Sequence, residues 1–332
     1  MRDVAGAASV SVGTVSNVLN APHKVAPGTV ERVQAAIDRL GFVRNDAARQ
    51  LKTGRSRSIG LLVLDIGNPF FTDIARASEH RAATHNLTLL LGTSDDDVRR
   101  EGAYIDAFDE QRVLGLLVSP IGEDLSRLAA LQRRGTPVVL VDRDGTGSPI
   151  DSVAVDDVAG ARMAVEHLLA AGRRRIAYVC GPTGLRQVRD RHRGAAEAVA
   201  AVADARLEVI SAPALTVLEG RAAGELLRDR PARRRPDAVF CANDLLAIGV
   251  LQALTLKGDM RVPDDIALVG YDDIDFARSA VVPLTSIAQP TAALGDTAVD
   301  LLVNAPNRTG DGEARNIVFE PKLIVRSSTA PN

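Results

Sequence analysis

From residue 58 onward, short continuous apolar runs alternate with longer stretches in which apolar residues recur at helical spacing. The runs span residues 59–64, 87–91, 113–118, 137–141, 176–180, 238–241 and 266–269. A strand that lacks polar residues is buried on both faces, which requires a parallel sheet with helices on each side. The alternation therefore predicts an α/β body of doubly wound parallel sheets.

Polar residues directly follow several of these runs. They are Asp65 to Asn68, Asp142-Arg143, Gly181-Pro182, Asn243-Asp244 and Asp272-Asp273. In doubly wound sheets, ligands bind beyond the carboxyl ends of the strands. We therefore expect the main ligand site at these strand ends.

The first 58 residues have a different pattern, with short helices expected over residues 3–8, 12–20 and 27–40. Ser11 is placed to cap the second helix through its hydroxyl, and Gly41 is placed to end the third in a left-handed conformation. A fourth helical stretch, 46–52, leads into a linker at 53–56. The third helix carries a predicted core stripe at spacings of three and four, formed by Val30, Val33, Ile37 and Leu40.

The formal net charge of −2 conceals an asymmetry between these two parts. Residues 1–58 contain nine Lys/Arg and four Asp/Glu, which gives +5, so the remaining 274 residues carry −7. A small basic part on a large acidic body suggests that the basic part contacts nucleic acid. A solvated basic face without a partner is the alternative that charge alone leaves open.

Composition and motif content exclude several classes of protein. With 46% hydrophobic and 25% charged residues, the chain is neither collagen-like nor disordered. It has no apolar run near the roughly 18 residues that span a bilayer, and no signal peptide. Two cysteines form no disulfide framework, so we expect the reducing cytosol and no membrane association.

Enzyme chemistry finds no support in the motifs. The sequence has no P-loop, Rossmann glycine fingerprint, HExxH or paired CxxC, and its five histidines are dispersed. We therefore expect no catalytic residues, no metal and no cofactor.

Two sets of short motifs occur in order along the chain. In the first 60 residues they are Asp3-Val4-Ala5, Val10-Ser11, Thr14-Val15-Ser16, Val18-Leu19-Asn20, Asn45, Ala48, Leu51, Arg55-Ser56 and Ile59-Gly60. In the remainder they are Val165 to Leu168, Arg191 to Gly194, Asn243-Asp244, Val269 to Asp273 and Pro283 to Ile287. Together these motifs resemble the LacI/GalR family of bacterial transcription regulators. The resemblance implies an all-α helix-turn-helix head (1–44), a hinge (45–58) and a periplasmic-binding-protein-like body (59–332).

The resemblance further implies that the helix over 12–20 enters the DNA major groove, which accommodates an α-helix. Val12 and Gly13 occupy its first turn, where Val12 can contact a thymine methyl group and Gly13 allows close backbone approach. Asn17, one turn further on, can bridge an adenine through its amide. The other predicted DNA contacts on this helix are hydroxyl side chains near its N-terminus, Ser11, Thr14 and Ser16.

This chain differs from the family pattern at three notable positions. Relatives usually carry Gly where Ser9 stands, so the turn must be accommodated differently. They usually carry Arg where Asn17 stands, which removes a guanine-reading group and changes the expected operator. Many place an aromatic residue where this chain has Leu215, which weakens the ligand prediction.

In the hinge, the resemblance implies DNA contacts by Asn45, Ala48, Leu51 and Arg55. Asn45 would cap the hinge helix, and Arg55, with Arg57, would face phosphate. Leu51 would be wedged between base pairs in the minor groove, where two hinge helices of a dimer meet and kink the DNA. The alternative is that Leu51 packs on the body of its own subunit. A helix this short is marginal alone, so its order can depend on DNA.

The implied body has two lobes joined by crossing strands, lobe one over 59–155 and 289–317, and lobe two over 156–288 and 318–332. A small molecule would bind between them. Arg191 would donate to it, Asp272 would accept from its hydroxyls, and Asn243 could do both. The predicted contacts from lobe one are Asn68, Phe70, Phe71, Asp142 and Arg143.

Four of these residues have plainer alternative roles. Arg191 could be a surface arginine among its basic neighbours, and Asp272 could form an Asx turn. Asn243 could cap the helix that follows it, and Phe71 could belong to the core.

The predicted function is a ligand-responsive, sequence-specific DNA-binding regulator, expected to be a repressor that binds a near-palindromic operator as a homodimer. The expected effector is a sugar or sugar derivative, with a nucleoside possible, and the sequence does not decide between inducer and corepressor. No heptad repeat follows the last expected strand (316–325), so a dimer rather than a tetramer is expected. The alternative function is a transport-type sugar-binding protein.

Overall fold

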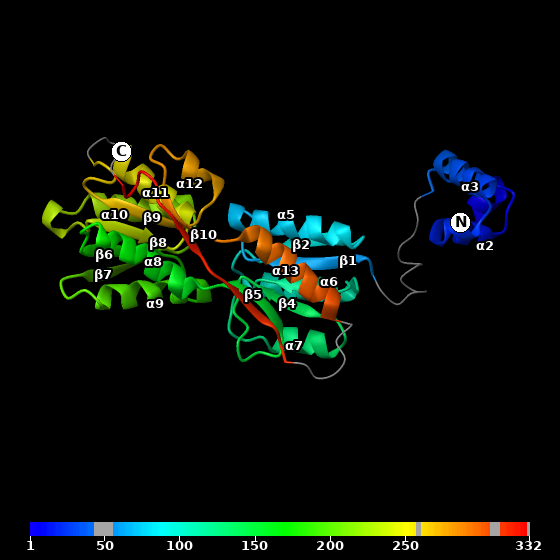
Figure 1. Ribbon diagram of the computed structural model, residues 1–332, viewed down its shortest axis with the longest axis horizontal. Helices are drawn as coiled ribbons and strands as arrows, with labels where there is room; N and C mark the ends of the chain where they lie inside the picture. The colour runs from blue at the N-terminus through cyan, green and yellow to red at the C-terminus, as the bar shows by residue number, and fades with distance from the viewer. Residues whose placement is uncertain (43–55, 257–259, 306–312, 331–332) are drawn as a thin grey trace. The chain divides into compact units, whose positions relative to one another are not determined.

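The computed structural model of the chain describes residues 1–42, 56–256, 260–305 and 313–330. The chain divides into two compact units, Met1–Ser56 and Arg57–Asn332, which we call the head and the body (Figure 1). The division falls within the segment expected to connect the DNA-binding and effector-binding parts.

The head is a small helical unit that contains α1 (Arg2–Ala7), α2 (Val12–Asn20), the 3-10 helix η1 (Pro22–Lys24) and α3 (Pro27–Leu40). Ser11 caps α2 as predicted, because its hydroxyl accepts the Thr14 amide at 3.0 Å. Gly41 ends α3 with a φ of +58°, also as predicted. The core stripe on α3 is partly wrong, since Leu40, the last residue of the helix, is 46% exposed and Ala36 is buried instead.

The first lobe of the body is built on a parallel sheet with the strand order β11-β5-β4-β3-β1-β2. Its elements are β1 (Ser58–Val63), α5 (Pro69–Thr84), β2 (Thr88–Thr93), α6 (Val98–Glu110), β3 (Leu116–Val118), α7 (Ser126–Arg133), β4 (Val138–Val141), β5 (Asp151–Val155), α13 (Thr291–Asn304) and β11 (Asn316–Phe319).

The second lobe has a matching sheet in the order β12-β10-β9-β8-β6-β7, in which β12 is antiparallel to β10. Its elements are α8 (Asp157–Ala170), β6 (Arg175–Cys180), α9 (Arg186–Ala200), β7 (Arg206–Ser211), α10 (Val217–Arg228), the 3-10 helix η2 (Ala232–Arg234), β8 (Ala238–Cys241), α11 (Asp244–Thr255), β9 (Ala267–Asp272), α12 (Asp275–Ser279), β10 (Thr285–Ala288) and β12 (Lys322–Ile324). The predicted fold class is confirmed: a helical head and a body of two doubly wound lobes.

The chain passes between the lobes after β5, after β10 and after β11. The stretch expected as one strand over 316–325 is two strands, β11 in the first sheet and β12 in the second (Figure 1, red). Val318 and Phe319 pair with Ala154 and Val155 of the first sheet, so the last crossing lies after Phe319 rather than after residue 317.

Side chains at the strand ends also start the helices that follow them. Asn68 accepts the Phe70 amide at the start of α5, and Asn243 accepts the Leu246 amide at the start of α11. Asp156 accepts the Ala159 amide at the start of α8. These caps satisfy first-turn N–H groups that have no partner within the helix. The cap residues are thereby fixed at the edge of the sheets, where the predicted ligand site lies.

Candidate functional site

The surface of the head that the sequence assigns to DNA is the N-terminal part of α2. Val12, Gly13 and Asn17 are exposed there, and Val12 is 43% accessible. Val15 and Val18 on the opposite face are buried in the head core. The apolar face of α2 is thus used for packing, and the predicted base-contacting face remains open to a partner.

The hydroxyl groups of this helix already have hydrogen-bond partners. The hydroxyls of Ser11 and Thr14 lie 2.9 Å apart, and the Ser16 hydroxyl accepts from the Asn20 amide at 3.2 Å. Such side chains can still contact phosphate through remaining donors or lone pairs. The hinge predictions for Asn45, Ala48, Leu51 and Arg55 lie outside the described residues.

The body contains a cavity of about 230 Å³ between its two lobes. It lies at the carboxyl ends of β1, β4, β6, β8 and β9, where doubly wound sheets bind ligands. Of the eight residues predicted to contact the effector, it is lined by Asn68, Phe70, Phe71, Asp142, Arg191, Asn243 and Asp272. The further lining residues are Leu64, Asp65, Asp95, Asp96, Leu185, Gln187, Val188, Ala214, Leu215 and Thr216.

Arg191 lies at the base of this cavity and is not a surface arginine. It is 5% exposed, and its Nε donates to Asp157 at 2.7 Å while Nη1 donates to the Ala242 carbonyl at 2.6 Å. Its guanidinium lies over the Tyr271 ring, 3.7 Å from the centroid, and 3.8 Å from Asp272. These contacts fix the guanidinium plane, which suits directional donation to a ligand oxygen.

Asp272 joins the two lobes within the cavity. Its carboxylate accepts from Asn68 of the first lobe at 3.2 Å and from Gln289 at 2.8 Å. Burial raises its pKa to about 6, against the opposing effect of the nearby Arg191 charge. Its φ of +103° is rare for a residue with a side chain, and strained conformations of this kind gather at ligand sites.

Asp142 is the corresponding carboxyl group of the first lobe. It is 4% exposed, and its Oδ2 accepts from Gln187 of α9 at 2.8 Å. Its Oδ1 has no hydrogen-bond partner among the described residues. Burial, together with the charge of Asp157, raises the pKa of Asp142 to about 8. The raised pKa favours the neutral carboxyl, which can donate as well as accept.

The structure agrees with the alternative roles suggested for Asn243, a helix cap, and for Phe71, a core residue. Asn243 caps α11, and its amide donates to the Leu215 carbonyl at 3.1 Å, so both ends of its side chain are occupied. Phe70 and Phe71 are 2% and 6% exposed and pack edge to face at 5.0 Å. All three still line the cavity, which makes them walls that shape it.

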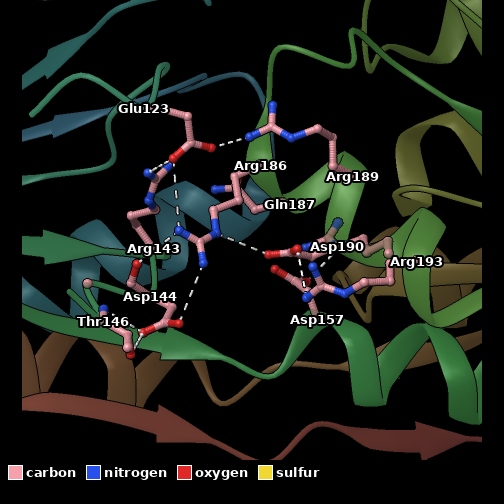
Figure 2. Close-up of polar contacts among 12 residues, drawn as sticks. Glu123, Arg143, Asp144, Thr146, Asp157, Arg186, Gln187, Arg189, Asp190 and Arg193 are labelled. Carbon is pink, nitrogen blue, oxygen red and sulfur yellow. Dashed lines mark hydrogen bonds and ion pairs between the residues drawn. The ribbon is translucent and has the colours of Figure 1, made fainter. Parts of the chain in front are cut away.

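Arg143 is the one predicted effector residue that does not line the cavity. Its side chain is 4% exposed and forms an ion pair with Glu123 of the same lobe (Figure 2). It follows Asp142 in the chain, and consecutive residues at this strand end point in different directions. The pairing with Glu123, which lies 20 residues away in the sequence, was not predicted.

Other cavity residues were missed by the sequence reasoning. Asp95 and Asp96 follow β2 and have left-handed φ values of +48° and +57°. Burial and the neighbouring charges of Asp65 and Asp95 raise the pKa of Asp96 to about 6. Gln187 stands one helical turn before Arg191, a spacing that places both on one face of α9 and could have identified it.

Two kinds of feature are absent from the part of the chain that the structure describes. No helix there has the length and apolar character to cross a bilayer. In the same residues, no group of three or more His, Cys, Asp or Glu side chains is arranged to hold a metal ion.

Comparison with known proteins gives consistent relationships along the chain. Residues 1–45 match the family model "Bacterial regulatory proteins, lacI family", and residues 165–329 match a periplasmic binding protein-like domain. The chain is 35% identical to the ribose operon repressor of Bacillus subtilis, over 91% of this chain and 90% of the relative. It is 33% identical to the HTH-type transcriptional repressor PurR of Photobacterium profundum, over 99% and 98%.

A solved structure with similar architecture extends over both parts of the chain. The lac repressor dimer bound to operator and the anti-inducer ONPF has a TM-score of 0.85 and 28% identity, and the alignment covers 98% of each chain. Sequence motifs, fold and full-length relatives agree, and the chain belongs to the LacI family of bacterial transcriptional regulators.

Proposed function

We propose that this regulator is a repressor that binds a near-palindromic operator as a homodimer and responds to a small hydroxyl-rich effector. The observation that carries the proposal is the pairing, in one chain, of an exposed recognition face on α2 with a cavity between the two lobes that places buried carboxyl, amide and guanidinium groups beside apolar walls. A transport-type binding protein would have no use for the exposed recognition face on α2. The protein would act by binding DNA and effector rather than by catalysis. It would do so in the cytoplasm, where bacterial DNA lies.

The cavity favours an uncharged, hydroxyl-rich effector over an anionic one. Its ionisable lining residues are five aspartates and Arg191. Burial favours the neutral form of Asp142, but the other carboxylates remain, and the Arg191 guanidinium is already in contact with Asp157. A phosphate or carboxylate would face net repulsion, whereas hydroxyls can donate to the carboxylates and accept from the guanidinium. The buried rings of Phe70 and Phe71 supply an apolar wall against a sugar ring. The relative named as a ribose operon repressor makes D-ribose the first candidate.

Homodimer formation would supply the two-fold symmetry that a palindromic operator requires. The body carries exposed apolar side chains on both lobes, among them Val98 at 64%, Phe276 at 57% and Val281 at 93%. A pair of heads gives two recognition helices, and a single small DNA-binding module usually buries less surface than a typical specific complex. The dimeric state of the similar lac repressor structure supports the same assembly.

The effector would act by changing how the lobes are arranged. Asn68–Asp272 and Gln187–Asp142 are hydrogen bonds between the lobes inside the cavity, so a ligand that replaces or reinforces them changes the relative stability of the lobe arrangements. The resulting change in operator affinity equals the differential affinity of the effector for the two states. An effector that favours the DNA-binding state is a corepressor, and one that opposes it is an inducer.

A ligand screen on matched variants tests the effector site. We expect D-ribose or a related sugar to raise the melting temperature of the wild-type chain, with free purines as a second arm of the screen. Asp272→Asn should abolish the shift, because one of the two oxygens that accept from Asn68 and Gln289 is replaced by an amide donor. Arg193→Ala is the control, since Arg193 is on the same helix as Arg191 but its side chain is 58% exposed. A shift that survives in Asp272→Asn would show that the ligand binds elsewhere.

A further inference from the structure

Glu123 of the first lobe lies among guanidinium groups that come from both lobes (Figure 2). Its carboxylate forms ion pairs with Arg143 of its own lobe and with Arg189 of α9 in the second lobe. A third guanidinium, that of Arg186, lies 3.9 Å away, also on α9. One carboxylate of the first lobe is therefore shared by three arginines, two of which come from the second lobe.

The two arginines of the second lobe are held in place by their own lobe. Arg189 donates to the Thr183 carbonyl at 2.8 Å and to the Gly184 carbonyl at 2.9 Å. Arg186 donates through Nε to Asp190 at 3.2 Å. These contacts fix the guanidinium groups at the start of α9 in the position from which they meet the first lobe. Less side-chain entropy is then lost when the lobes come together.

The buried positive charge of Arg143 requires a nearby negative charge, and Glu123 supplies it. The Arg143 side chain is 4% exposed, whereas that of Glu123 is 57% exposed. Burial lowers the pKa of Arg143, the nearby charges of Arg186 and Arg189 lower it further, and Glu123 opposes both effects. Without the carboxylate, a buried guanidinium of one lobe would face two guanidiniums of the other. The same contact would then repel rather than attract.

A second carboxylate of the first lobe takes part in the same contact. Arg186 lies 3.6 Å from Asp144 through Nη2, and its Nη1 donates to the Asp144 carbonyl at 3.5 Å. Exposed ion pairs of this kind are individually weak, but removing one partner of a buried charge leaves that charge uncompensated and is strongly destabilising. Loss of the Glu123 carboxylate is therefore expected to shift the balance between open and closed lobes.

We propose that Glu123, Arg143, Arg186 and Arg189 form a clasp that holds the lobes in the closed arrangement. The clasp sets the fraction of molecules that are closed before any effector is bound. Because the apparent Kd of a ligand that needs the closed state is its intrinsic Kd divided by that fraction, the clasp also sets effector affinity. This last step rests on the proposed effector site, whereas the closing of the lobes does not.

The clasp is tested by measuring the distance between the lobes without ligand. Spin labels are placed on cysteines introduced at the exposed positions Arg133 and Ala201, one on each lobe. The native cysteines, Cys180 and Cys241, are at most 1% exposed and stay unlabelled. We expect Glu123→Gln to move the distance distribution toward longer values and to broaden it. Raising salt from about 0.1 M to about 1 M, which shortens the Debye length from about 10 Å to about 3 Å, should move the wild-type distribution in the same direction.

The matched control is Glu197→Gln, which removes an exposed ion pair with Arg162 inside the second lobe. It should leave the distance distribution unchanged, and Glu123→Asp should restore part of the wild-type distribution. A Glu123→Gln protein that melts cooperatively and keeps the wild-type distribution at both salt concentrations overturns the clasp.

A second measurement separates the clasp from the effector assignment. D-ribose affinity should fall by about threefold in Glu123→Gln and stay at the wild-type value in Glu197→Gln. Unchanged D-ribose affinity in an opened Glu123→Gln protein contradicts the link to effector affinity. If wild-type protein binds no D-ribose, the effector proposal fails while the distance measurement still decides the clasp.

Discussion

Ser9 is the clearest example at the residue scale of a position where this chain carries an unfavourable residue. It has a φ of +52° at the end of α1, where the Val10 amide donates to the Ala5 carbonyl and the Ser9 amide to the Gly6 carbonyl. This is the hydrogen-bond pattern of a Schellman cap, which usually contains glycine. Relatives were expected to have glycine here, and the turn is accommodated by a strained serine.

Ser9→Gly should therefore stabilise the head by about 0.5–1 kcal/mol, because glycine adopts the left-handed region without steric cost. Slower amide hydrogen exchange in α1 and α2 of the full chain is the measurement. Gly41→Ala is the matched control: Gly41 has the same place at the end of α3, and the Phe42 amide donates to the Ile37 carbonyl as Val10 does to Ala5. That variant should destabilise the head by a similar amount. Faster exchange in Ser9→Gly would mean that the serine side chain stabilises the turn.

The raised pKa of Asp142 predicts how the stability of the body depends on pH. Its pKa is raised to about 8 in the folded state, above the unfolded value near 4. A folded state that binds the proton more tightly is favoured at low pH, so this contribution is complete below about pH 4 and is lost as pH rises through 8. Asp272, with a pKa of about 6, adds to the loss within the same interval.

Asp142→Asn should raise the free energy of unfolding at pH 8 and flatten its decline between about pH 4 and pH 8. Asparagine tolerates the left-handed φ of +56° at this position, so the backbone need not change. Urea unfolding across that pH range is the measurement, with Asp73→Asn as the comparison, since the Asp73 side chain on α5 is 41% exposed. A wild-type profile retained in Asp142→Asn would show that other groups cause the pH dependence.

Individual site residues were predictable where the strand ends could be read directly. Asn68, Asp142, Asn243 and Asp272 each end a strand or begin the helix after it, and all four line the cavity. Arg143 could not be placed, because its direction depends on a contact with Glu123 from a different loop. A strand end fixes where a residue lies but not which neighbour it turns toward.

At the scale of elements, Gly13 of α2 allows a test of whether a residue is present for DNA binding rather than for folding. Gly13 is in the first turn of α2, has no positive φ, and a Cβ there would meet the Ser11 hydroxyl oxygen at an ordinary 3.5 Å. The fold therefore gives no reason for glycine, which usually costs about 1 kcal/mol relative to alanine inside a helix.

Gly13→Ala should stabilise the head but weaken operator binding by about tenfold, or 1.4 kcal/mol, because the methyl group keeps the backbone from the DNA. Fluorescence anisotropy on a selected operator is the measurement. Gly28→Ala is the control, since Gly28 has the same place in α3 and nothing lies near its Cβ position. Equal operator affinity in Gly13→Ala and wild type would remove the close-approach role from Gly13.

The strands show why the sequence predicted the lobes well but not every member of the sheets. Fully buried strands such as β4 and β8 are continuous apolar runs, and the pattern predicted both. Edge strand β7 is mostly exposed and carries Arg206 and Glu208, so it has no apolar run. Strand β5 is fully buried but begins with Asp151, whose carboxylate accepts from the Arg315 amide at 2.8 Å. Pairing with a distant segment, which no local pattern contains, makes that polar strand possible.

At the scale of the whole molecule, the asymmetry of charge corresponds to a division of roles. The head, with its excess of basic residues, carries the exposed face of α2, and the acidic body carries a cavity lined by five aspartates. The lobes around that cavity are joined by the hydrogen bonds of Asn68 and Gln187 and by the clasp. We therefore expect ligand binding and lobe arrangement to be coupled by contacts within the body.

Occupancy of the cavity is expected to control operator affinity. The most direct test selects an operator from random DNA with the full chain and measures its Kd with and without the sugar found by the ligand screen. We predict enrichment of a two-fold symmetric sequence, and a Kd for that operator that changes when the sugar is added to the wild type. Because coupling is reciprocal, the operator should change the Kd for the sugar by the same factor. Asp272→Asn should bind the operator with no response to the sugar. A sugar that binds the cavity while leaving operator affinity unchanged would contradict the account.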